Sequence, residues 1–167
     1  MLACSASLSG TPPPDRADAP LLAPSGRESL VVPLKYASHL STTSDTCPPP
    51  DALQRSQTCY RWVKDPLDGT SFVPPALMAG HPAASERTPK CTEFGLSMFE
   101  TATHARTAYA RITKRHPRFA ERVGTHLAEL KIELTHGVQS KARKGHFDLH
   151  EFDGVDLCKV ATVVGLL

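Results

Sequence analysis

The sequence predicts an α+β fold in which a small, largely antiparallel sheet packs with one main helix and one short helix. Several short stretches alternate apolar and polar residues as strands do, whereas one long stretch repeats its apolar residues at helical spacing. The two helical stretches also follow one another directly, without the regular alternation of strand and helix that a parallel sheet requires. Antiparallel pairing of the strands is therefore expected.

The composition of the chain changes near residue 58. Of its 15 prolines, nine fall within the first 50 residues, and nine of its ten aromatic residues follow residue 58. A proline-rich segment with few large apolar residues cannot bury enough surface to offset the entropy that it loses on ordering. We therefore expect residues 1–57 to be mostly disordered and residues 58–167 to form a single α+β domain.

The predicted domain begins with a strand over residues 59–64, in which Cys59, Arg61 and Val63 share one face. Residues 65–90 contain five prolines and several turn-forming residues, which is typical of a long irregular loop. A loop of this length in a small domain is commonly functional.

The main helix follows a second predicted strand over residues 91–99. Thr101 is a suitable N-cap because its hydroxyl can accept a hydrogen bond from a free backbone N–H of the first turn. Pro117 ends this helix and begins the short one, which Gly124 terminates.

Three further strands complete the expected sheet, over residues 126–134, 145–152 and 160–167. The first alternates apolar and charged residues and is expected to be half-buried. The last is almost wholly apolar, which favours a central or well-covered position in the sheet.

The five cysteines are an odd number, widely spaced, and without a Cys-x-x-Cys pair. This spacing argues against a zinc ribbon or a disulfide framework and favours reduced thiols in a cytosol. Cys59 and Cys91 lie on predicted strands, where small core residues are the expected role.

The net charge of +2 and the pI near 8.3 are milder than those of a dedicated nucleic-acid-binding domain. The N-terminus has no long apolar run of the kind that a secretory signal or a membrane span needs. We therefore expect a soluble cytoplasmic protein without a membrane partner.

The run over residues 145–152 holds more chemically active side chains than any other window. Strand alternation places His146, Asp148 and His150 on one face, where imidazole and carboxylate groups could bind zinc or iron. His126 or His136 could supply a further ligand. An exposed polar edge explains the same pattern, and we expect no metal.

Glu151 lies on the opposite face of this predicted strand, together with Phe147 and Leu149. A carboxylate among apolar groups is costly to bury unless it is paired, and enzymes use such groups as bases or electrostatic stabilisers. A structural salt bridge, for example to Arg61, is the alternative.

The order of Tyr60-Arg61-Trp62 on the first strand, residues 95–99 on the second and Glu151 on a late strand resembles the arginine, serine, glutamate order of ADP-ribosyltransferases. The resemblance implies that Arg61 anchors NAD, that Ser97 shapes the nicotinamide pocket, and that Glu151 stabilises the ribose during transfer. Glu129 is a competing choice for the carboxylate. The implied function is a small NAD-utilising transferase, of toxin or effector type, with an acceptor still to be identified.

A basic helix face supports an alternative function, namely a non-enzymatic module that binds nucleic acid or protein. Lysine and arginine side chains there could neutralise phosphates, although a solvated helix face is the more frequent explanation of such a run. The face comprises Arg106, Arg111, Lys114, Arg115, Arg118 and Arg122, and Lys141, Arg143 and Lys144 extend it. Arg111, Lys114, Arg115 and Arg118 are its candidate binding residues. A metal-dependent hydrolase that uses the histidine face is the third candidate.

Overall fold

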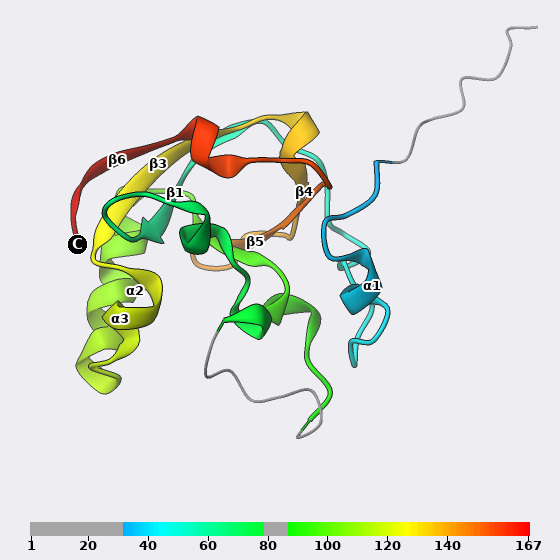
Figure 1. The fold of residues 1–167 in the computed structure, drawn as a ribbon, viewed down its shortest axis with the longest axis horizontal. Coiled ribbons are helices and arrows are strands. Elements are labelled where there is room, and N and C mark those ends of the chain that lie inside the picture. Colours follow the sequence, from blue (N-terminus) through cyan, green and yellow to red (C-terminus); the bar gives the residue numbers. More distant parts are fainter. Residues whose placement is uncertain (1–31, 79–86) are drawn as a thin grey trace, which may run out of the picture. The chain divides into compact units, whose positions relative to one another are not determined.

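The computed structural model describes residues 32–78 and 87–167, and all structural statements refer to these residues. They form a six-stranded sheet in the order β4-β5-β2-β1-β3-β6, in which each neighbouring pair is antiparallel (Figure 1). The strands are β1 (Gln57–Val63), β2 (Leu96–Phe99), β3 (His126–Ile132), β4 (Gly137–Gln139), β5 (His146–Glu151) and β6 (Ala161–Leu166).

Three α-helices accompany the sheet, and they are α1 (Ala37–Leu40), α2 (Ala102–Arg115) and α3 (Phe119–Val123). Helix α2 begins as expected, because the Thr101 side chain accepts a hydrogen bond from the His104 backbone N–H at 3.1 Å. The prediction of an α+β fold with an antiparallel sheet, one main helix and one short helix is confirmed. Helix α1 is an addition to it.

One face of the sheet carries the larger apolar core. Along each strand, the residues of this core alternate with residues that point to the other face, as expected for strands. The core is closed by Phe72 from a 3₁₀ turn (Gly69–Phe72) and by Leu157 from another (Leu157–Val160). The strand residues of this core are Cys59, Val63, Leu96, Met98, Ala128, Leu130, Ile132, Phe147 and Leu149. We call this side of the sheet the core face.

Helices α2 and α3 cover part of the other side, which we call the helix face (Figure 1). Here Trp62, Phe99 and Leu127 pack around Ala105 of α2, all of them buried. The Trp62 indole also donates a hydrogen bond to the Ala105 carbonyl at 3.0 Å, which fixes α2 against β1. The helices pack on β1, β3 and the Phe99 end of β2, and cavities lie beside them over the rest of β2 and β5.

Two strand predictions differ from the structure. Residues Cys91–Glu93 form a 3₁₀ turn, and β2 begins only at Leu96. Strand β6 lies at the edge of the described sheet, where Val164 and Leu166 are 47% and 66% exposed, so the expected central position is wrong. A run of apolar residues does not by itself distinguish a covered strand from an edge strand.

Residues 32–56, the docked segment, run along the β4–β5 side of the domain. The Lys35 N–H donates to the Glu151 carbonyl at 2.9 Å, and Leu53 pairs with Gln139 in an isolated β-bridge. The sequence prediction placed this segment in the disordered part, because it considered apolar burial alone. Backbone hydrogen bonds and a disulfide hold the segment instead. Residues 1–31 lie outside the described part of the chain.

The disulfide joins Cys47 of the docked segment to Cys91 ahead of β2. The expectation of fully reduced thiols is therefore wrong for these two residues, whereas Cys59 and Cys158 are free. The pairing could not be expected from spacing, because the partners lie 44 residues apart.

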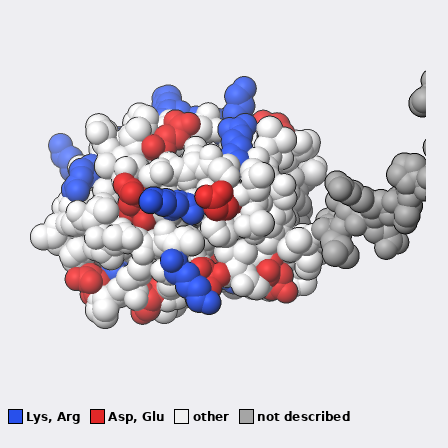
Figure 2. Space-filling model, turned by 90° about the horizontal axis from the view of Figure 1, so that it is seen from above, with Lys and Arg blue, Asp and Glu red and all other residues white. Residues whose placement is uncertain are grey.

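Among the described residues, no helix is both long and apolar enough to cross a membrane. Charges of both signs are mixed on the face seen from above in Figure 2, where Lys and Arg side chains stand beside Asp and Glu. That face carries no extended field of one sign, which a general electrostatic binding surface would need.

Candidate functional site

The sheet is weakest between β1 and β2. Strands β1 and β3 pair through seven residues each, whereas β1 meets β2 only at Tyr60 and Phe99. Arg61 occupies the gap that opens beyond this pair. Its Nε donates to the Ser71 carbonyl at 2.8 Å, and its Nη1 donates to the Ser97 carbonyl at 2.8 Å. The Arg61 side chain thus replaces backbone pairing where the two strands separate.

Arg61 is 6% exposed, and this burial lowers the pKa of its guanidinium to about 10. The nearby Glu151 and Asp148 carboxylates oppose the shift. The group therefore keeps its positive charge at neutral pH. Its two hydrogen bonds to backbone carbonyls hold the Arg61 guanidinium, and thus its charge, in a fixed position between β1 and β2.

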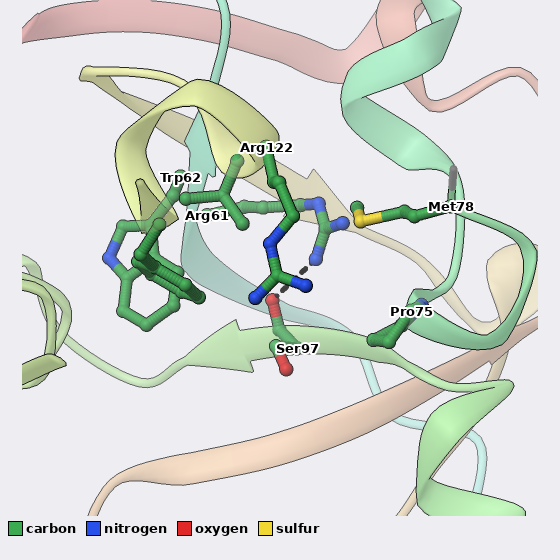
Figure 3. Close-up of a pocket in the computed structure, with 8 residues that line it drawn as sticks. Arg61, Trp62, Pro75, Met78, Ser97 and Arg122 are labelled. Atoms are coloured by element: carbon green, nitrogen blue, oxygen red, sulfur yellow. Dashed lines mark hydrogen bonds between the residues drawn. The ribbon is translucent and has the colours of Figure 1, made fainter. Parts of the chain in front are cut away.

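A cavity of about 110 Å³ lies at the gap (Figure 3). Figure 3 shows the guanidinium groups of Arg61 and Arg122 both directed toward Ser97, with Trp62 to one side and Met78 and Pro75 to the other. The lining residues are Arg61, Trp62, Pro75, Met78, Ser97, Phe119, Arg122 and Val123. The cavity is therefore mostly apolar, with two cations beside one carbonyl.

Two larger cavities extend from the same position over the helix face. One, of about 600 Å³, shares Trp62, Ser97 and Phe119 with the first and adds a basic rim of Arg111, Arg143 and Lys144. The other, of about 490 Å³, shares Ser97, Arg143 and His146 with the second and adds Asp148. Because Ser97 lines all three, we treat them as one depression and call it the β2 groove.

Two carboxylates line this groove, the exposed Asp51 and the buried Asp148. Asp148 is the one on the sheet. It lies directly opposite Ser97 in the β2–β5 ladder, and His146 Nε2 lies 3.8 Å from its Oδ1. Burial raises the pKa of Asp148 to about 6, against the opposing effect of the Arg61 charge. Burial also lowers the pKa of His146, with a smaller contribution from Arg61.

Gly95 makes room for Asp148. A Cβ atom at Gly95 would lie 2.7 Å from the Asp148 Cβ and 3.3 Å from the His150 ring, closer than side chains normally approach. The glycine therefore allows the Asp148 and His150 side chains to pack against the chain just before β2.

Glu151 lies elsewhere. Strand alternation places it on the core face, where it is 2% exposed and accepts a hydrogen bond from Lys35 Nζ at 3.2 Å. Burial raises its pKa, while the Lys35 and Arg61 charges oppose the shift. Arg61 and Ser97 line one cavity, but Glu151 is not among the residues that line the β2 groove. Glu129, the competing choice, accepts a hydrogen bond from the Tyr60 hydroxyl at 2.9 Å.

The three residues proposed as metal ligands share a face but do not converge on one point. His146 approaches Asp148, whereas His150 Nε2 lies 3.7 Å from Cys91 Sγ. The suggested additional ligands are also engaged elsewhere, because His126 approaches Asp65 at 3.6 Å and His136 accepts from the Glu133 N–H.

Among the described residues, the potential ligand atoms that do gather within 4.8 Å of one another belong to Cys47, Cys91 and His150. Sequence reasoning missed this cluster, because Cys47 and His150 lie in segments that meet only in the folded chain. No local spacing of the kind found in zinc motifs marks them.

The basic side chains of the helix region divide between two places. Arg111 lines the β2 groove, whereas Arg115 and Arg118 line a separate cavity of about 470 Å³ together with Arg122. Lys114 is exposed and lines neither cavity. Arg122, Arg143 and Lys144, which the sequence placed on the basic face or its extension, also line these cavities.

No family model, curated protein or solved structure matches the chain. Any function assigned to the chain therefore rests on the arrangement of side chains in and around the β2 groove.

Proposed function

We propose that the chain binds NAD in the β2 groove and transfers its ADP-ribose group to an acceptor. The observation that carries the proposal is the position of Ser97, where a small apolar cavity beside Arg61 opens into a larger cavity with a basic rim. An apolar recess joined to a cationic channel matches a ligand with a flat ring at one end and phosphates in the middle. The resemblance to ADP-ribosyltransferases through Arg61 and Ser97 points the same way.

The groove has the properties that recognition of NAD requires. The combined depression is of a size typical of small-molecule sites, and the larger cavities alone are about 600 and 490 Å³. Trp62 and Phe119 offer aromatic surfaces for the nicotinamide ring. Arg111, Arg143 and Lys144 could pair with the two phosphates, since arginine forms paired hydrogen bonds with phosphate oxygens.

In the transfer, the bond between the nicotinamide nitrogen and the ribose carbon breaks, and nicotinamide leaves as a neutral molecule with the bonding electrons. The ribose carbon then carries positive charge until a nucleophilic atom of the acceptor bonds to it and releases its proton to solvent. A nearby carboxylate stabilises this charge. We assign that role to Asp148, because it lines the groove opposite Ser97, whereas Glu151 pairs with Lys35 on the core face.

The first test is binding and turnover of NAD by the wild-type chain. Calorimetric titration with NAD measures binding, and chromatography measures nicotinamide released in the presence of candidate protein or nucleic-acid acceptors. We expect saturable binding that Arg143→Ala weakens by about tenfold, because one phosphate contact is lost. A chain that neither binds NAD nor releases nicotinamide contradicts the proposal.

The second test separates the two carboxylates. Removing an electrostatic stabiliser typically slows catalysis by about 10²–10³-fold, so Asp148→Asn should lose turnover on that scale while retaining NAD binding. Glu151→Gln is the matched control on the same strand and should retain turnover. The reverse result, with Glu151→Gln inactive and Asp148→Asn active, would move the catalytic role to Glu151.

The cavity at Arg115, Arg118 and Arg122 favours a second function, the binding of nucleic acid through its phosphates. The three cations line this cavity with Phe119, and they come from the end of α2, the N-cap of α3 and the last turn of α3. Binding of a labelled oligonucleotide should weaken steeply with added salt and fall in Arg115→Ala and Arg118→Ala. Affinity that salt does not change argues against this function.

A further inference from the structure

The buried side chain of His150 lacks a conventional hydrogen-bond partner. It is 3% exposed, its Nδ1 has no partner among the described residues, and its Nε2 faces the Cys91 sulfur at 3.7 Å. A buried imidazole normally satisfies both nitrogens, and leaving one unpaired has an energetic cost. The second sulfur, that of Cys47, belongs to the same cluster.

The spacing of these atoms suits a tetrahedral metal site. Zinc binds sulfur at about 2.3 Å and imidazole nitrogen at about 2.0 Å, which separates neighbouring sulfur and nitrogen ligands by about 3.5 Å. The distance of 3.7 Å between Cys91 Sγ and His150 Nε2 is close to this value. The two sulfurs are bonded here, so they would have to separate to about 3.8 Å, the sulfur-to-sulfur edge of the same tetrahedron.

Cys91 is held in place by a further contact. Its backbone N–H donates to Asp45 Oδ1 at 2.8 Å, so the docked segment orients the residue independently of the disulfide. Supporting hydrogen bonds of this kind keep metal ligands in position. His150 lies on β5, which is paired with strands on both sides. After cleavage of the disulfide, two of the three ligands therefore remain anchored.

We propose that Cys47, Cys91 and His150 bind a zinc ion when the disulfide is reduced, and that the disulfide is the metal-free form of the same site. A dithiol reductant supplies the two electrons, becomes a disulfide itself and leaves two thiols on the chain. Zinc then displaces the two thiol protons to solvent and takes the imidazole as its third ligand, with water in the fourth position. The site is independent of NAD binding.

The test compares one protein in two redox states. The full chain is stripped of metal and divided into an oxidised sample and a sample reduced with a phosphine, which is then removed. Zinc binding is measured by competition with a coloured chelator, and cobalt binding by the thiolate-to-metal absorption of tetrahedral sites. We expect one metal ion per reduced chain and none per oxidised chain.

Variants locate the site. Cys158→Ser removes a free, partly exposed thiol outside the cluster and should bind zinc as the wild type does. The double variant Cys47→Ser/Cys91→Ser should lose binding, and His150→Gln should weaken it by at least about tenfold with an altered cobalt spectrum. Zinc should also raise the melting temperature of the reduced wild type, because a ligand that binds only the folded state stabilises it.

Equal zinc binding by the reduced wild type and the double cysteine variant would overturn the proposal. So would a reduced wild-type chain that unfolds and that zinc does not refold, or a cobalt spectrum that His150→Gln leaves unchanged. The last result would mean that thiols alone bind the metal and that His150 only packs against them.

Discussion

The two strand pairs β1–β3 and β2–β5 lie in the same sheet but differ in what they bury. Between β1 and β3, each face carries one wholly apolar cross-strand pair, Cys59 with Leu130 on the core face and Trp62 with Leu127 on the helix face. Between β2 and β5, Leu96 faces Leu149 on the core face, but the next pair, Ser97 and Asp148, is polar.

Within one sheet, the residues that stabilise the fold thus differ from the polar residues that line the candidate site. The core face is continuous across both pairs, so the fold does not depend on the polar residues above it. On the helix face, α2 and α3 pack on Trp62, Leu127 and Phe99, whereas Ser97, His146 and Asp148 of the β2–β5 pair line the groove. Strands β2 and β5 can carry polar side chains in the groove because their apolar side chains on the core face hold both strands in the sheet.

The largest expected effect tests the attachment of the docked segment to the β2–β5 pair. The disulfide joins residues 44 positions apart, and the loss of such a crosslink from the unfolded chain destabilises the fold by about 4 kcal/mol. Urea denaturation of Cys47→Ser/Cys91→Ser, in the presence of a metal chelator, should show a loss of this size. A loss below about 1 kcal/mol would mean that the docked segment contributes little.

A slightly smaller effect is expected in the β1–β3 pair. Leu130 is fully buried in the core, so Leu130→Ala should lower the free energy of unfolding by about 3 kcal/mol through lost burial and a cavity. Ser97→Ala, in the groove, should cost less than about 1 kcal/mol. Equal losses in the two variants by urea denaturation would contradict this difference between the residues that stabilise the fold and those that line the candidate site.

A third prediction concerns the close packing at the end of β2. The Cβ of Gly95→Ala would lie 2.7 Å from the Asp148 Cβ, so the variant should be destabilised by about 1–3 kcal/mol. Gly69→Ala is the matched control, because no atom lies within 4 Å of its new Cβ. Thermal denaturation of both measures the difference. A Gly95→Ala chain as stable as Gly69→Ala would show that β5 shifts easily.

The smallest effect concerns a thiol inside the β1–β3 pair. Burial raises the pKa of Cys59 to about 12, although the Arg61 charge opposes this, so the thiol stays protonated and unreactive at mildly alkaline pH. Cys158 is partly exposed. Mass spectrometry after iodoacetamide treatment of the folded chain should show Cys158 alkylated at least about tenfold faster than Cys59. Comparable rates would indicate opening of the core.

Local patterns in the sequence predicted most of the regular elements of the described fold. The alternation around Arg61, the N-cap at Thr101 and the alternation of β5 all appear in the structure, because each depends on neighbouring residues. The same alternation also placed Asp148 and Glu151 on opposite faces, as the structure has them.

The features that sequence reasoning missed depend on distant residues. The edge position of β6 is set by strand order, and the order β4-β5-β2-β1-β3-β6 cannot be inferred from any one strand. The β2 groove joins residues of β1, β2, α2, α3 and β5 with the loop before β5 and with the docked segment. The cluster of Cys47, Cys91 and His150 joins three separate segments. The partner that engages Glu151, Lys35, came from a segment that composition alone had marked as disordered.

The disulfide between Cys47 and Cys91 also makes a covalent ring, and β1, which lies between β2 and β3 in the sheet, is part of that ring. A single peptide-bond cleavage anywhere inside the ring leaves both pieces of the chain linked through sulfur. Such a nicked molecule keeps its mass apart from one added water, and it separates into two fragments only after reduction. The sulfur bond thus provides a second covalent path between the docked segment and the rest of the sheet.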